Sequence, residues 1–129
     1  MSEDIKTAII DYGMGNLFSV QQACMHAGID AVITRGPQNI EDASALILPG
    51  VGAFGDAMNN LRALNLIDPI KRSVEEGKPF LGICLGLQLL MSESEEFGTH
   101  QGLNIIPGRT VKFPLENGQE SFRKVPQVG

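Results

Sequence analysis

Cysteine is scarce in this sequence, which holds only Cys24 and Cys84, too few for the disulfide framework of a small secreted domain. No apolar run approaches the roughly 20 residues of a membrane-spanning helix. The acidic N-terminal stretch 1–6 lacks the apolar segment of a signal peptide. Ten basic residues against fifteen acidic ones, without a basic cluster, argue against a nucleic-acid partner. These absences predict a soluble cytoplasmic protein with reduced thiols.

The most informative stretch is Gly82-Ile83-Cys84-Leu85-Gly86. The short apolar run 78–83 leads into it and the helix-forming run 85–91 follows it, which is the order of a buried parallel strand that turns at once into a helix. A cysteine at this turn, with glycine two positions away on each side, matches the nucleophile elbow with sulfur in place of oxygen. Glycines are expected there because the tight turn crowds its flanking residues.

The elbow would give Cys84 the chemistry of a nucleophile. Its thiol would project above the sheet at a helix N-terminus, where the partial positive charge favours thiolate. The free backbone N–H of Leu85 could donate to an oxyanion. The alternative is a buried structural cysteine between two core elements. That interpretation is expected for Cys24, which lies on the apolar face of a helix beginning at Leu17.

A cysteine nucleophile usually needs a base, most often a histidine. The chain offers only His26 and His100. The helical pattern places His26 on the exposed side of its helix, and His100 lies in a Gly-Thr-His-Gln-Gly loop with no carboxylate suggested as its partner. Neither histidine is therefore a predicted catalytic base. We expect no metal site and no cofactor.

Short apolar runs and helical patterns alternate along the chain as far as residue 91. The expected strands are 7–10, 31–34, 45–48 and 78–83. The expected helices begin at Leu17, near Asp56, at Asp68-Pro69 (as cap and first turn) and after Cys84. An acidic loop over 92–98 and candidate strands at 103–106 and 110–113 follow. This order predicts one doubly wound α/β domain, with a mostly parallel sheet, helices on both faces and a β-rich C-terminal extension.

The stretch 50–55, Gly-Val-Gly-Ala-Phe-Gly, has the spacing of a dinucleotide-binding fingerprint. The acidic residue expected about 20 positions later is absent, however, since Cys84 ends the next strand. The fingerprint also usually opens on the first strand of a fold, and this is the third. The alternative is an anion-binding loop of backbone N–H groups. Such a loop would face the same side of a parallel sheet as Cys84 and could supply a second oxyanion donor.

Polar residues after the elbow are candidates for binding a substrate. Gln88 lies four residues after Cys84 and so one helical turn above it. Glu93, Glu95 and Glu96 form an acidic run from which one carboxylate could reach a substrate's ammonium group. The alternatives are a polar core residue for Gln88 and a solvated surface for the acidic run.

These motifs together resemble a known family. The stretch 78–90, Lys-Pro-Phe-Leu-Gly-Ile-Cys-Leu-Gly-Leu-Gln-Leu-Leu, resembles the elbow of class I, triad-type glutamine amidotransferases. The stretches 11–20 and 48–58 are similar to one branch of that family, which works in histidine biosynthesis. The resemblance covers essentially the whole chain and implies a flavodoxin-like sheet.

The resemblance also implies a reaction. Cys84 would attack the side-chain amide of glutamine, releasing ammonia and leaving a glutamyl thioester that water then hydrolyses. The oxyanion site would comprise Gly50, Val51, Gly52 and Leu85, with the amides of Val51 and Leu85 as donors. Gln88 and Glu96 fall where the family binds glutamine. The ammonia would pass to a partner cyclase subunit with a (β/α)₈ barrel, and the loops 13–16 and 49–55 are candidates for the surface that faces it.

The chain also departs from the family pattern. Gln127 and Val128 stand where a His-Met pair is common, and the triad's histidine and glutamate would lie beyond residue 129. The sequence is therefore expected to be the N-terminal two-thirds of an amidotransferase domain, without glutaminase activity as it stands. One rival is a fragment that docks on the cyclase without catalysis. Another is a small cysteine-elbow hydrolase or chaperone, in which a histidine would replace Leu85.

Overall fold

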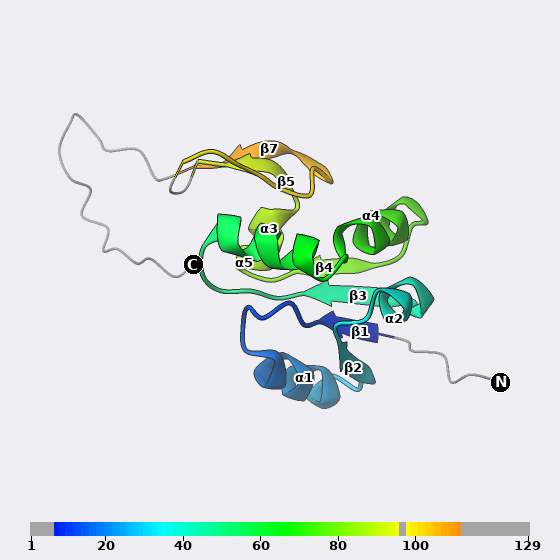
Figure 1. Cartoon of the computed structure of the whole chain (residues 1–129). Helices are drawn as coiled ribbons and strands as arrows, with labels where there is room; N and C mark the ends of the chain where they lie inside the picture. The colour runs from blue at the N-terminus through cyan, green and yellow to red at the C-terminus, as the bar shows by residue number, and fades with distance from the viewer. Residues whose placement is uncertain (1–6, 96–97, 112–129) are drawn as a thin grey trace.

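The computed structural model describes residues 7–95 and 98–111. Its main sheet has four parallel strands in the order β2-β1-β3-β4 (Figure 1). They are β1 (Thr7–Ile10), β2 (Ala31–Thr34), β3 (Ala45–Leu48) and β4 (Phe80–Gly82). The chain grows outward from β1 in both directions, which creates a topological switch between β1 and β3. Ligand sites of open α/β sheets lie at the carboxyl edge of the strands near such a switch.

Helices cover both faces of this sheet, as predicted. They are α1 (Leu17–His26), α2 (Pro37–Asp42), α3 (Phe54–Ala63), α4 (Ile67–Glu75) and α5 (Leu85–Leu89). Alternate residues of each strand point to opposite faces. Ile9 and Ile47 therefore pack towards α1, whereas Ile10 and Leu48 join the larger core with α2 to α5. Figure 1 shows α1 on one side of the sheet and α3 and α5 on the other.

A second, three-stranded sheet in the order β6-β5-β7 forms the β-rich extension. Its strands are β5 (Met91–Ser94), β6 (His100–Gln101) and β7 (Ile106–Thr110), and β5 is antiparallel to β6 but parallel to β7. It packs over α3 and α5, on the side away from the main sheet (Figure 1). No helix among the described residues is long and apolar enough to cross a membrane.

Several predicted boundaries after the elbow are wrong. The expected acidic loop begins as strand β5, and α5 ends at Leu89 because the chain joins the second sheet from Met91 onward. The strand expected at 103–106 lies instead at 106–110, with Pro107 inside it. Of the strand expected at 110–113, residues 112 and 113 lie outside the described residues.

The first half of the chain shows smaller differences. The sequence reading missed α2, a six-residue helix with one buried apolar residue, Ile40, too short for a helical pattern. Helix α3 begins at Phe54, two residues before the predicted start. Helix α4 begins at Ile67 with Leu66 as its cap, so Asp68 and Pro69 both lie in its first turn. Strand β4 is not fully buried: it is the edge of the described sheet, and Leu81 is 54% exposed.

Candidate active site

The turn between β4 and α5 positions Cys84. This residue is the N-cap of α5 and has φ 53° and ψ −119°, a left-handed backbone that non-glycine residues rarely adopt. Strain of this kind persists only where the surroundings enforce it, and it clusters at functional sites. The side chain of Cys84 is exposed. The geometry of the predicted elbow is thus confirmed, and the alternative of a buried structural cysteine is wrong at this position.

The two flanking glycines allow the turn to close. A Cβ at Gly82 would lie 2.8 Å from the Cα of Leu87. A Cβ at Gly86 would lie 1.7 Å from the carbonyl oxygen of Leu48 in β3. Both obstacles are backbone atoms, so neither can move aside as the end of a flexible side chain would. The sequence spacing predicted this crowding correctly.

Cys24 has a different environment. Its side chain is only 7% exposed and packs with Ile9, Ala31 and Ile47 beneath α1. The prediction of a small core residue is confirmed for Cys24. His26, at the last position of α1, is exposed as predicted.

The loop after β3 lies directly against the elbow. The backbone N–H of Leu85 donates to the carbonyl oxygen of Gly50 at 3.1 Å. The expectation of a free Leu85 amide is therefore wrong for this conformation. The reason is that the loop places a carbonyl at the start of α5, where it satisfies one of the N–H groups that a helix leaves unpaired.

A buried tyrosine is hydrogen-bonded to the same loop. The hydroxyl of Tyr12, which follows β1, donates to the carbonyl oxygen of Pro49 at 2.5 Å, and the side chain is 1% exposed. Burial raises the pKa of Tyr12 above its ordinary value, so the phenol stays protonated as a donor. A Cβ at Gly50 would lie 2.1 Å from this hydroxyl oxygen. The sequence did not predict this contact of Tyr12, because the only indication was the position of Tyr12 between a strand and a glycine turn.

The loop after β1 is held at its own base. The carboxylate of Asp11 accepts from Nε and Nη2 of Arg35 at 3.2 and 2.9 Å and from the backbone N–H of Gly13 at 3.2 Å. Farther along, a Cβ at Gly15 would lie 3.1 Å from the Cα of Gly50. The loops after β1 and β3 therefore touch at the carboxyl edge of the sheet.

The remaining oxyanion and substrate candidates lie on these same elements. Gly52 has φ +113°, which favours glycine, and a Cβ there would lie 2.9 Å from Cε of Met14. Val51 beside it is 63% exposed. Gln88 lies on α5 and its side chain is half-buried. The elbow and the loop 49–52 are thus in contact through the bond from Leu85 to Gly50, whereas the oxyanion and substrate roles of Val51, Gly52 and Gln88 stay predictions.

The acidic run does not behave as one unit. Glu96 lies outside the described residues. Glu93 and Glu95 both pair with Arg109 of β7, at 3.3 and 2.8 Å. This ion-paired surface agrees with the alternative of a solvated acidic run for these two residues.

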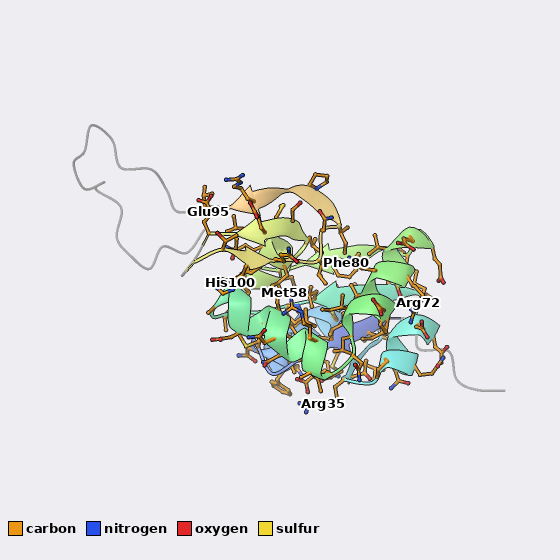
Figure 2. The ribbon with its side chains drawn as sticks, turned by 45° about the horizontal axis from the view of Figure 1, so that its top comes forward. Arg35, Met58, Arg72, Phe80, Glu95 and His100 are labelled. Carbon is orange, nitrogen blue, oxygen red and sulfur yellow. The ribbon has the colours of Figure 1, made fainter. Side chains whose placement is uncertain are left out.

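His100 lies in β6 rather than in a loop. A Cβ at Gly55, in the first turn of α3, would lie 2.8 Å from the imidazole ring, so the ring packs against that turn. Figure 2 shows His100 and Glu95 on the side of the second sheet, with Arg35 on the far side of the molecule. Among the described residues, no group of His, Cys, Asp and Glu side chains could hold a metal ion.

Comparison with known proteins identifies the family of the chain. The model of the family "Glutamine amidotransferase class-I" matches residues 8–128. The chain is 58% identical over 122 residues to "Imidazole glycerol phosphate synthase subunit HisH" of Syntrophotalea carbinolica, a match to 94% of this chain and 59% of that protein. The HisH subunit of Aquifex aeolicus is 49% identical over 126 residues, covering 97% of this chain and 58% of the relative. The chain therefore spans somewhat under two thirds of the length of these curated relatives.

Solved structures share the fold at lower identity. A crystal structure of a glutamine amidotransferase aligns with a TM-score of 0.67 at 22% identity, over 88% of this chain and 59% of that one. A putative peptidase E from Listeria monocytogenes aligns with a TM-score of 0.63 at 15% identity, over 78% of this chain and 63% of that one. These two likenesses concern the fold alone.

Proposed function

Because the chain belongs to the class-I glutamine amidotransferase family, we propose that its gene product is the glutaminase subunit of imidazole glycerol phosphate synthase, a cytoplasmic enzyme of histidine biosynthesis. The observation that carries this proposal is the exposed, backbone-strained Cys84 between two glycines that tolerate no side chain. The HisH relatives at 49% and 58% identity support the choice of branch.

In the proposed reaction, Sγ of Cys84 attacks the side-chain amide carbon of glutamine. The carbonyl oxygen becomes an oxyanion, the C–N bond then breaks, and ammonia leaves with a proton from a general acid. Water attacks the resulting glutamyl thioester and frees glutamate and the thiol. The family resemblance assigns the acid and base to a histidine, oriented by a glutamate, beyond residue 129. Gln88 and Glu96 are the proposed ligands of glutamine, and no metal or cofactor takes part.

The oxyanion site needs a rearrangement of the loop after β3. In the described conformation the Leu85 N–H is taken by the Gly50 carbonyl. The carbonyl and the N–H of one planar trans peptide point in opposite directions. A turn of the Gly50–Val51 peptide would therefore release the Leu85 N–H and bring the Val51 N–H towards Cys84 in the same motion. This turn changes ψ of Gly50 and φ of Val51, and Gly50, which has no Cβ, gives the peptide backbone freedom on its N-terminal side.

This rearrangement would link the two subunits. The loops after β1 and β3 touch each other at the carboxyl edge of the sheet, and Val51 presents an exposed apolar side chain there. A partner cyclase that binds over loops 13–16 and 49–55 would contact the residues that must move. In this proposal the described conformation is a resting state, and docking of the ligand-loaded cyclase favours the state with two oxyanion donors.

The test is a reconstitution with the (β/α)₈-barrel cyclase and its phosphoribulosyl-formimino-carboxamide ribonucleotide. The gene product should make formation of imidazole glycerol phosphate dependent on glutamine, whereas free ammonia should drive the cyclase without it. A gene product that leaves the glutamine-dependent rate at background would contradict the proposed function.

A further inference from the structure

Tyr12 connects three elements of the site through two hydrogen bonds. Its hydroxyl donates to the Pro49 carbonyl in the loop after β3. Its own carbonyl oxygen accepts from Nδ2 of Asn60 in α3 at 3.0 Å. The residue therefore ties the end of β1 to α3 and to the loop that must rearrange. None of the sequence motifs assigns it this task.

The position of the bond within the loop matters. The Pro49 carbonyl belongs to the peptide directly before Gly50, and the Gly50 carbonyl that caps Leu85 belongs to the next one. Two consecutive carbonyls are thus hydrogen-bonded to different elements, one to a buried phenol and one to the first amide of α5. The Leu85 bond has to break when the oxyanion site forms. The Tyr12 bond does not, because the Pro49 peptide lies outside the unit that turns.

We propose that Tyr12 is a positioning residue whose hydroxyl holds the Pro49 carbonyl as the fixed pivot about which the Gly50–Val51 peptide turns. This inference rests on the proposed function. A fixed pivot confines the motion to one peptide and sets where the Val51 N–H arrives. Without it the whole 49–52 loop would shift, and the donor would miss the oxyanion by enough to weaken its stabilisation of the transition state.

Two features of the site fit a pivot. Gly50 leaves room for the phenol, since a Cβ there would lie 2.1 Å from the Tyr12 hydroxyl oxygen. The raised pKa of Tyr12 also keeps the hydroxyl a donor across the working pH range. A rival explanation is that Tyr12 only fills the core and satisfies one buried carbonyl. That explanation predicts a loss of stability but no specific effect on the chemical step.

The matched control is a second buried hydroxyl that donates to a proline carbonyl. Ser73 is 1% exposed, and its Oγ donates to the Pro69 carbonyl within α4 at 2.8 Å. Helix α4 leads into the amino end of β4, whereas Tyr12 lies at the carboxyl edge. Tyr12→Phe and Ser73→Ala each remove one buried hydroxyl that donates to a proline carbonyl. Ser73→Ala also removes an acceptor of Lys78 Nζ at 3.4 Å, so it is the more severe loss of bonds but lies away from the loop.

The experiment measures glutamine hydrolysis by the gene product bound to cyclase and its nucleotide. Tyr12→Phe should lower kcat roughly 10-fold, the equivalent of one misplaced donor bond, while KM for glutamine stays unchanged. Ser73→Ala should keep both constants. An unchanged kcat in folded Tyr12→Phe, or an equal fall in Ser73→Ala, would overturn the pivot.

A second readout separates the pivot from the proposed function, because it needs no glutaminase activity. Hydrogen exchange of the Leu85 amide reports its bond to Gly50, and Tyr12→Phe should speed that exchange roughly 10-fold relative to Ser73→Ala. Equal Leu85 exchange in the two variants would overturn the pivot even in an inactive protein. A wild-type protein without glutaminase activity but with the expected exchange difference would contradict the function and leave the pivot supported.

Discussion

Replacing Gly86 by alanine should destabilise the protein more than any surface glycine substitution, for a reason that can be worked from the structure. The new Cβ would lie 1.7 Å from the Leu48 carbonyl oxygen, against a limit of 3.0 Å that real Cβ contacts respect. Helix α5 would have to retreat from β3 by at least 1.3 Å. Its buried side chains, Leu85 and Leu89, would then lose packing against the core.

The expected loss combines two terms. Overpacking that displaces backbone costs about 3 kcal/mol. The retreat of α5 would also weaken the hydrogen bond from the Leu85 amide to the Gly50 carbonyl, which is worth about 1 kcal/mol. The free energy of unfolding should therefore fall by about 3 to 4 kcal/mol, which corresponds to roughly 6 to 16 °C in Tm for a protein of this size. Urea unfolding followed by far-ultraviolet circular dichroism measures the difference.

Gly28→Ala is the control for that measurement. Gly28 has φ +77° but nothing within 4 Å of a new Cβ, so only backbone strain of about 1 kcal/mol is expected. If Gly86→Ala proved no more destabilising than Gly28→Ala, the inferred packing of α5 on β3 would be incorrect, and with it the reason for glycine beside the elbow.

Four further predictions follow from the same geometry. Iodoacetamide should label exposed Cys84 of the folded protein and spare buried Cys24; faster labelling of Cys24 would contradict the assignment of the nucleophile. Gly52→Val should still fold but lower glutaminase turnover on the order of 10²-fold, because valine disfavours φ +113° in the loop that we propose supplies one oxyanion donor; a variant with full turnover would refute this role. Burial raises the pKa of Tyr12 in the folded protein, so above a pH of about 10 this tyrosine ionises more readily in the unfolded chain. The free energy of unfolding should therefore fall as the pH rises above about 10, by up to about 1.4 kcal/mol per pH unit. Urea unfolding at a series of pH values should show a smaller fall in Tyr12→Phe than in the wild type, and an equal fall would refute this prediction. The 129-residue chain should release no glutamate from glutamine even with cyclase present; a rate equal to that of the full gene product would show that no residue beyond 129 is needed.

The elbow and the main sheet could be predicted because local chemistry determines them. A short apolar run, a glycine on each side of Cys84 and a helix former admit few other structures, and the crowding at Gly82 and Gly86 bears this out. The alternation of strands and helices likewise predicted the parallel sheet. Helix α2 was not predicted, because its six residues include only one buried apolar residue, Ile40, and so show no helical periodicity.

The finer features depend on contacts distant in sequence, which the pattern does not encode. Nothing local to Leu85 indicates that a carbonyl 35 positions earlier caps its amide. Tyr12 and Pro49 are 37 residues apart, and their bond exists only because β1 and β3 are neighbours. The ion pairs of the acidic run depend on distant contacts in the same way: Glu93 and Glu95 pair with Arg109, which lies beside them only because β5 pairs with β7.

The proposed role of Cys84 as the nucleophile of glutamine hydrolysis is tested most directly by glutamate release from the gene product bound to cyclase and nucleotide. Cys84→Ser should reduce the rate to background, because the serine hydroxyl lacks the ready ionisation of a thiol. Cys24→Ser is the matched control and should keep the wild-type rate once folded. Glutamate release by Cys84→Ser at the rate of Cys24→Ser would contradict the account.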